Sequence, residues 1–209
     1  MSRPGRLIIL TGINGVGKTE QATRLQKRAA EEGVSLENIH VLKSSPAVTA
    51  MRGVVLAPET HLQSEWAEVL AFYTMIAETA EQVVVPKLEA GQNILLDRGP
   101  DSTHVYNFLL KGLDKTHPEL APIYDQLMKI LQPDLVILLD APSEVTLKRA
   151  AQQGETDHLQ DYEKEVHEQR RQGFLTLAKS SGWTILDATQ SIDEVAAEVW
   201  SLVSSTLNA

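Results

Sequence analysis

The sequence predicts an α/β fold of three layers, in which a five-stranded parallel sheet has helices on both faces. Five short apolar runs recur along the chain, and longer segments with helical periodicity separate them. Strands that alternate with helices are typical of a parallel sheet, because each parallel connection needs a long crossover. The first apolar run also leads directly into a glycine-rich turn and a helix, which is the local order of a phosphate-binding unit.

The length and composition are those of a single globular domain over residues 1–209, of which 43% are hydrophobic and 22% charged. The net charge of −9 argues against a general nucleic-acid or membrane-surface binder, because those anionic surfaces repel an acidic protein. The absence of cysteine excludes disulfides and thiolate metal sites. No apolar run approaches membrane-spanning length and no signal-peptide region precedes the first strand, so we expect a cytoplasmic protein.

The predicted strands are the apolar runs 7–10, 39–42, 94–96, 135–139 and 184–186. The first helix is predicted over Glu20–Glu32, because it places its apolar residues on one face and stops at Gly33. A second helix is predicted over Ser64–Val85, with Pro86 and Gly91 bracketing its end. Further helices are predicted over 119–131, 143–153, 161–179 and 192–207, whereas the weakly patterned segment 47–62 is predicted to be a loop or an irregular helix.

The turn after the first strand is a complete G-x-x-x-x-G-K-[ST] phosphate-binding loop, Gly12–Thr19. Its glycines let backbone N–H groups turn toward an anion, Lys18 supplies a positive charge for the outer phosphates, and the Thr19 hydroxyl can ligate Mg²⁺. With a strand before it and a helix after it, the loop predicts a P-loop NTPase fold that binds ATP and Mg²⁺. The predicted ATP-binding residues are Gly12, Asn14, Gly15, Val16, Gly17, Lys18 and Thr19.

Three further strands are each followed by a carboxylate, and ligands of open α/β sheets collect at the carboxyl ends of strands. Asp97 can order Mg²⁺ or orient an attacking oxygen, and Arg98 beside it offers a planar fork for a phosphate. A lone strand-end Asp is more often a cap or turn residue, but the pair beside a phosphate loop favours function. For Asp140 the two interpretations are balanced, with Ser143 a candidate N-cap, and Asp187 is interpreted as structural.

The segment Asp97–Asn107, DRGPDSTHVYN, resembles the thymidylate kinase signature D-R-Y-x-x-S-x-x-A-Y-Q. Other stretches similar to that family follow the same order along the chain: the phosphate loop with Gln21, Phe72, 133–135 with 139–142, Leu147-x-Arg149, 170–174, and the closing segment 187–195. The resemblance covers almost the whole chain. The phosphate loop alone is generic, and the order and spacing of the other motifs make the resemblance specific.

The resemblance implies a kinase that transfers the γ-phosphoryl group of ATP to a pyrimidine deoxynucleotide, dTMP foremost, with a small-molecule nucleotide as partner and a homodimer as assembly. It implies a catalytic set of Lys18, Asp97, Arg98 and Arg149, with Thr19 and Asp97 near the metal. Arg98 would hold the acceptor phosphate and Arg149 would approach ATP from a lid segment at about 150–160. The implied acceptor-binding residues are Phe72, Ile76, Arg98, Ser102, Thr103 and Tyr106.

Two of these acceptor residues carry specific roles and specific alternatives. Phe72 would stack on the acceptor base, although core packing on its apolar helical face explains it equally well. Tyr106 would crowd the sugar C2′ and disfavour a ribose hydroxyl, with core packing again as the alternative. Phe72 and Ile76 lie four residues apart and should share a helix face toward the base.

The chain departs from the family pattern at four places. Asn14 stands where the family usually has Asp, and Ser44-Ser45-Pro46 replaces R-E-P. Ile76 replaces an Arg that reads thymine, and Asp157-His158-Leu159-Gln160 replaces the lid motif D-R-[FI]-E. Because phosphoryl transfer depends on neutralising charge, these losses leave two alternatives open: a kinase of the same fold with a different or modified nucleotide acceptor, and a nucleotide-binding regulatory protein with weak turnover.

Overall fold

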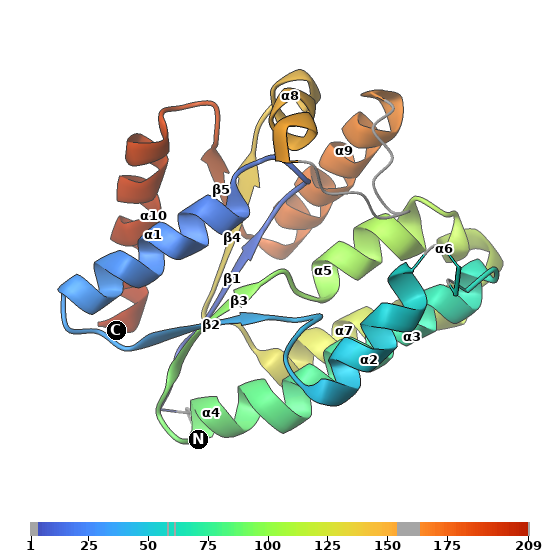
Figure 1. Cartoon of the computed structure of the whole chain (residues 1–209), viewed down its shortest axis with the longest axis horizontal. Helices are drawn as coiled ribbons and strands as arrows, with labels where there is room; N and C mark the ends of the chain where they lie inside the picture. Colours follow the sequence, from blue (N-terminus) through green and yellow to red (C-terminus); the bar gives the residue numbers. More distant parts are fainter. Residues whose placement is uncertain (1–3, 58, 61, 154–163, 209) are drawn as a thin grey trace.

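The computed structural model describes residues 4–57, 59–60, 62–153 and 164–208. Its five strands form one parallel sheet in the order β2-β3-β1-β4-β5 (Figure 1). The strands are β1 (Leu7–Thr11), β2 (Leu36–His40), β3 (Asn93–Asp97), β4 (Leu135–Asp140) and β5 (Thr184–Asp187). The predicted fold class, a parallel sheet between helical layers, is confirmed.

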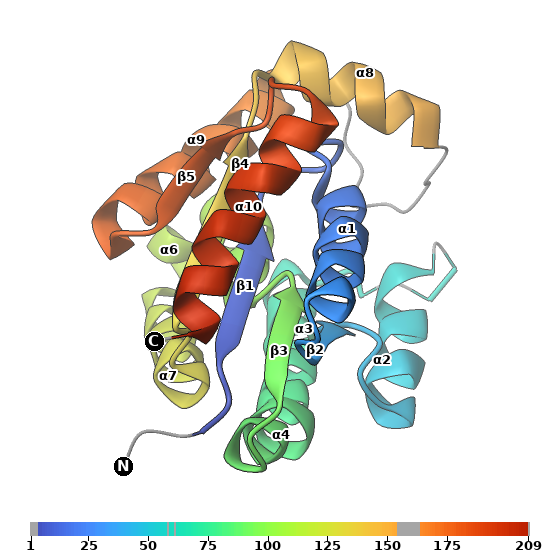
Figure 2. The same cartoon turned by 90° about the vertical axis from the view of Figure 1, so that its left-hand side faces the viewer.

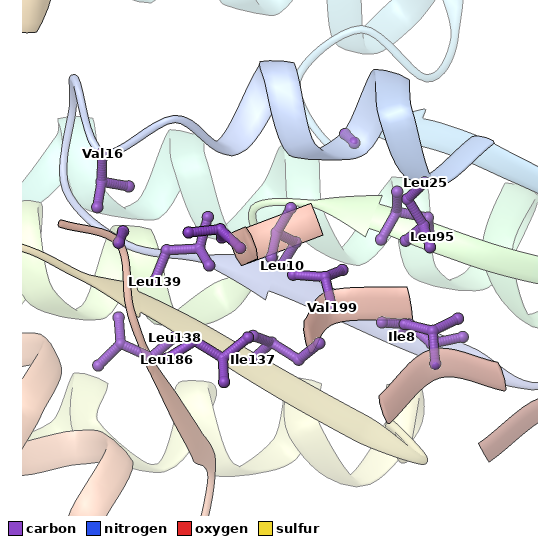
Figure 3. Packing of buried hydrophobic residues seen from close by; sticks show 14 of the residues in the cluster. Ile8, Leu10, Val16, Leu25, Leu95, Ile137, Leu138, Leu139, Leu186 and Val199 are labelled. Carbon is purple, nitrogen blue, oxygen red and sulfur yellow. The ribbon is translucent and has the colours of Figure 1, made fainter. Parts of the chain in front are cut away.

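The central strand, β1, is buried along its whole length and faces both helical layers. Its alternate residues divide between two hydrophobic clusters, because successive side chains of a strand point to opposite faces. Ile8 and Leu10 pack in the first cluster, together with residues of α1 (Lys18–Glu31) and α10 (Ile192–Leu207) (Figure 3). Leu7 and Ile9 pack in the second cluster with the opposite layer. Burial on both faces is why this strand reads as a continuous apolar run.

The first layer contains α1 and α10, which lie side by side on one face of the sheet (Figure 2). The apolar residues predicted for the first helix, Ala22, Leu25 and Ala29, are all buried there, and Gly33 adopts a φ of 73° just after the helix ends. Farther along the sheet, α9 (Lys164–Ser181) packs against β4 and buries Phe174 and Ala178. α8 (Ser143–Gln153) crosses the end of the sheet to which the strands point (Figure 2).

The second layer is a nearly continuous helix made of α3 (Glu65–Thr79), a π-helical turn η1 (Ala80–Val84) and α4 (Val85–Glu89), with α7 (Ala121–Leu131) beside it. The helix ends at Glu89, between Pro86 and Gly91 as predicted, and so continues four residues beyond the patterned stretch that stopped at Val85. Pro86 lies in the first turn of α4, where a missing N–H group is tolerated. No helix among the described residues is long and apolar enough to cross a membrane.

Two predicted boundaries on this side are corrected. β2 starts three residues earlier and ends two residues earlier than the apolar run 39–42 suggested, because its register with β3 pairs Leu36 with Asn93 and His40 with Asp97. As an edge strand it accepts polar residues. The segment 47–62 contains a regular helix, α2 (Pro46–Leu56), whose first turn is capped by the Ser45 hydroxyl accepting from the Val48 amide.

Short helical elements follow β3 that the sequence patterns did not predict. They are α5 (Pro100–Thr103), a π-helical turn η2 (His104–Leu109), α6 (Leu113–Thr116) and the 3₁₀ turn η3 (Pro118–Leu120). A π turn widens the helix by one residue, and such turns occur frequently at functional sites. η2 carries Tyr106, so this irregularity positions one of the predicted acceptor residues.

Candidate functional site

The phosphate loop lies at the carboxyl end of β1, where the sheet order turns from β3 on one side to β4 on the other. Gly15 has a φ of 76° and Gly17 a φ of 104°, conformations that glycine adopts without strain. Gly15 also lies directly against α8, since a Cβ there would be 2.1 Å from the Thr146 carbonyl oxygen. Within the described residues, the N–H groups of Gly15 and Gly17 donate no hydrogen bond to the protein, so they are available to an anion.

Lys18 begins α1 and is only 6% exposed. Its ammonium group donates to the Gly12 and Ile13 carbonyls, both at 2.9 Å, which holds the charge over the loop. The neighbouring Thr19 is exposed at the first turn of α1, where amide groups have no intrahelical acceptor. A Cβ on Gly17 would meet nothing within 4 Å, so the loop has open space on that side. These features fit a triphosphate, with the Thr19 hydroxyl placed for a metal ion.

Arg98 connects the phosphate loop with the neighbouring strand. It follows β3 in a left-handed conformation, φ 67°, and its backbone N–H donates to the Leu10 carbonyl at 3.3 Å. Its guanidinium group donates a short hydrogen bond to the side-chain oxygen of Asn14. Asn14 therefore ties this guanidinium to the phosphate loop.

Tyr106 lies between two guanidinium groups. Its ring centroid is 5.9 Å from the Arg98 guanidinium carbon and 4.9 Å from that of Arg170, and it meets the Phe174 ring edge-on at 5.8 Å. The Tyr106 hydroxyl is buried and has no hydrogen-bond partner among the described residues. A buried hydroxyl without a protein partner is a group that a bound ligand can satisfy.

Asp97 is 8% exposed and lies opposite His40 in the register of β2 and β3. Burial lowers the pKa of His40, Asp97 opposes that shift, and the charges of Arg98, Lys43 and Arg52 reinforce it. Three cationic side chains thus surround this end of β2 and β3. Arg52 comes from α2, and the sequence did not single it out because this segment was predicted only as a loop or an irregular helix.

Asp101 is a buried carboxyl group at the same edge of the sheet, 1% exposed. One oxygen accepts a short hydrogen bond from the Thr11 hydroxyl and a 3.4 Å bond from Ser102, while the other has no partner among the described residues. Burial raises the pKa of Asp101 against the effect of these hydrogen bonds. Thr103 is buried nearby, so α5 presents Ser102 as the more accessible of the two predicted hydroxyls.

His167 on α9 supports the phosphate loop from behind, a role that no local motif signals. Its ring lies 2.9 Å from the Thr146 hydroxyl of α8 and also forms a hydrogen bond with the backbone of Asn14. Burial is the main reason that the pKa of His167 is lowered, and the charges of Arg170 and Lys18 add to it. The neutral ring therefore joins α8, α9 and the loop.

The other strand-end residues hold the surrounding helices. Arg171 of α9 donates to both carboxylate oxygens of Asp140 at 2.7 and 2.8 Å, so this carboxylate is engaged in an ion pair. Ser143 is the first residue of α8 and not its N-cap as suggested, and its hydroxyl donates to Glu168 at 2.8 Å. Asp187 has the structural role predicted, accepting from the amide and the hydroxyl of Thr189. Arg149, the predicted lid-side cation, donates to the Ala188 carbonyl at 3.0 Å.

Phe72 and Ile76 are both buried, at 3% and 1% exposure. Phe72 packs with Val48, Leu56 and other residues of α2 and α3, whereas Ile76 packs in the cluster that covers the sheet. In this conformation both side chains pack in the core, which is the alternative given for Phe72, and a base could reach Phe72 only if α2 moved. Residues 154–160 of the predicted lid segment, with His158, lie outside the described residues.

The residues at the phosphate loop fit Mg²⁺ in part. Thr19 and Asp97 supply the oxygen ligands that this ion prefers, while no cluster of three or more His, Cys, Asp or Glu residues occurs in the part of the chain that the structure describes. Such a composition suits an ion that is held mainly by substrate phosphates, with one or two protein oxygens.

Comparisons with known proteins identify the family of this chain. The sequence pattern of the thymidylate kinase family matches residues 10–199. The thymidylate kinase of Deinococcus radiodurans is 35% identical over 202 residues, which cover 96% of this chain and 97% of the relative. That of Ruegeria pomeroyi is 31% identical over 214 residues, covering 100% and 99%. That of Chlamydia caviae is 32% identical over 189 residues, covering 90% and 91%. The chain belongs to the thymidylate kinase family of phosphotransferase enzymes.

Proposed function

We propose that this chain transfers the γ-phosphoryl group of ATP to dTMP, giving dTDP. Its relatives in Deinococcus, Ruegeria and Chlamydia are each named thymidylate kinase. The observation that carries the proposal is the hydrogen bond from Arg98 to Asn14, which brings an acceptor-side guanidinium onto the phosphate loop. A kinase needs both features, because donor and acceptor phosphates must meet in line.

The roles of the residues follow from their positions. The loop amides and Lys18 bind the outer phosphates of the donor, and the exposed Thr19 hydroxyl with Asp97 would hold Mg²⁺ or its waters. Mg²⁺ bound there would neutralise charge on the phosphates. Arg98 orients the acceptor phosphate toward the loop, since a guanidinium binds phosphate oxygens in a planar fork. Buried surroundings strengthen these charge interactions relative to water.

The acceptor base is held on the side of α2 and α3. Arg52, Lys43 and Arg98 provide positive charge there. Phe72 and Ile76 are buried in this conformation and would contribute apolar surface only after α2 moved. A pocket without a hydrogen-bond donor at position 76 discriminates less between bases than one with an arginine. We therefore expect dTMP to be the best acceptor, with other pyrimidine deoxynucleotides as measurable substrates.

The test is ATP consumption by the purified chain with each common nucleoside monophosphate, compared with Lys18→Ala. We expect turnover highest with dTMP and lost in the variant, with thermal melting little changed, because the Lys18 ammonium group donates to two carbonyls of the loop rather than to core groups of the sheet. Normal turnover in a folded Lys18→Ala variant would remove the kinase proposal. A different best acceptor would favour the alternative substrate. The homodimer stays a prediction that sedimentation analysis can check.

A further inference from the structure

Arg170 on α9 is a buried cation that the proposed function has not used. It is 9% exposed, and its guanidinium carbon is 4.9 Å from the Tyr106 ring centroid. Arg98, which reaches the phosphate loop through Asn14, approaches the same ring at 5.9 Å. Two guanidinium groups from different elements therefore converge on one tyrosine at the edge of the site.

The surroundings of Arg170 connect it with the phosphate loop as well. It follows His167 by one helical turn, and the ring of His167 bonds the backbone of Asn14. The positive charges of Arg170 and Lys18 both act on that ring. Lys18, Arg98 and Arg170 therefore enclose one region from the loop, β3 and α9. Positive charges brought together from three elements make this part of the site favourable for a bound anion.

We propose that Arg170 contacts the phosphoryl group in transit between the donor and the acceptor, and supplies from α9 a third positive charge to its oxygens. This inference rests on the proposed function. Charge on the equatorial oxygens is what a kinase must stabilise, and an arginine placed for this purpose acts mainly on kcat. The group that Arg170 would contact is a phosphate group that carries two or more negative charges.

A purely structural role makes a different prediction. Arg170 could serve only to pack on Tyr106, as cations do on aromatic faces elsewhere in proteins. The chain offers a matched control for such packing, because the Arg28 guanidinium lies 5.8 Å from the Trp200 ring centroid on the surface between α1 and α10. Arg171, the next residue of α9, is bound to Asp140 and serves as a control for an ion pair in the same helix.

The experiment compares Arg170→Met, Arg170→Lys, Arg28→Met and Arg171→Met in steady-state kinetics and thermal melting. We expect Arg170→Met to lower kcat about 100-fold, the size of losing one charge-stabilising donor, with both KM values within about threefold. Arg170→Lys should recover part of this loss. Arg28→Met should keep wild-type kinetics. Arg171→Met should lower the melting temperature, because it breaks the ion pair with Asp140, and should lower kcat less than Arg170→Met does. A kcat for Arg170→Met within threefold of wild type would overturn the inference.

A double variant separates contact with phosphate from support of the tyrosine. If Arg170 acts on phosphate, Arg170→Met still lowers kcat about 100-fold in a Tyr106→Leu background. If it only holds the ring, that further loss disappears. Calorimetric affinity for ADP with aluminium fluoride, a mimic of the group in transit, needs no turnover. If the wild type transfers phosphate to no acceptor, the proposed function fails. Even then, a tenfold lower affinity of Arg170→Met for ADP with aluminium fluoride would support this inference, and an affinity equal to that of the wild type would contradict it.

Discussion

Gly15→Ala should damage both the stability and the nucleotide affinity of this protein, and Gly33→Ala should damage only the former. Both glycines adopt nearly the same conformation, with φ of 76° and 73°. An alanine in that region costs about 1–2 kcal/mol relative to glycine. Only at Gly15 does the new Cβ also meet backbone, 2.1 Å from the Thr146 oxygen and 3.0 Å from the Ala150 nitrogen, while at Gly33 it meets nothing within 4 Å.

The contact at Gly15 cannot be relieved by a side-chain rotation, because both neighbours are backbone atoms of α8. Forcing backbone apart adds about 1–3 kcal/mol, so we expect a total loss of about 2–5 kcal/mol for Gly15→Ala. For a chain of this size, that corresponds to a melting temperature lower by roughly 4–20 °C, against roughly 2–8 °C for Gly33→Ala.

The two assays are thermal melting and calorimetric ATP affinity. We expect ATP to bind at least about tenfold more weakly to Gly15→Ala, because displacing the loop misaligns its amides, and equally well to Gly33→Ala. Equal melting temperatures and equal ATP affinities for the two variants would refute the packing of α8 on the loop as the reason for this glycine.

Three further predictions concern single side chains. Arg98→Met should raise the acceptor KM and lower kcat about 10-fold or more with ATP affinity nearly unchanged, and the opposite pattern would exchange the two subsites. Tyr106→Ala should bring kcat/KM for ribose and deoxyribose acceptors closer together, and equal values already in wild type would contradict the steric role. Burial lowers the pKa of His104, stacked on Tyr124 at 4.4 Å, from 6.5 to about 4. Between pH 6.5 and about pH 4, the unfolded chain therefore binds a proton at His104 that the folded chain does not bind. As the pH falls through this range, the free energy of unfolding decreases by on the order of 2 kcal/mol. His104→Phe should show a smaller fall in melting temperature over this window, and an unchanged fall would show that His104 is not responsible.

The sequence predicts the central strands and the phosphate loop well because their signals are local. β1 is buried on both faces, so it appears as an uninterrupted apolar run, and the loop is a contiguous motif. The predicted bounds of β2 were wrong because an edge strand carries polar residues, here Glu37 and Asn38, that an apolar run does not include. The segment of α2 is predicted only as one of two alternatives, a loop or an irregular helix, because its amphipathic pattern is weak, although the Ser45-Pro46 pair is a helix-start signal.

The site residues divide in the same way. Arg98 was found because it adjoins a strand end, whereas the functions inferred for His167 and Arg170 depend on how α9 packs against the loop. Their positions do carry a signal, since His167, Arg170, Arg171 and Phe174 recur at helical spacing on one face. Polar residues interleaved with a buried aromatic on one face indicate a helix that packs on a polar site. That pattern does not identify the site on which the helix packs.

The left-handed backbone of Arg98 has a consequence for how this position can vary. Gln132, the other non-glycine residue with positive φ among those described, ends a helix, where such a conformation is common. Arg98 follows a strand and gains no helix cap. A chain selected for thermal stability alone would favour glycine or asparagine here, by about 1 kcal/mol. Activity and stability therefore oppose each other at one residue, and stabilising substitutions sought across this protein should appear at position 98 only together with loss of turnover.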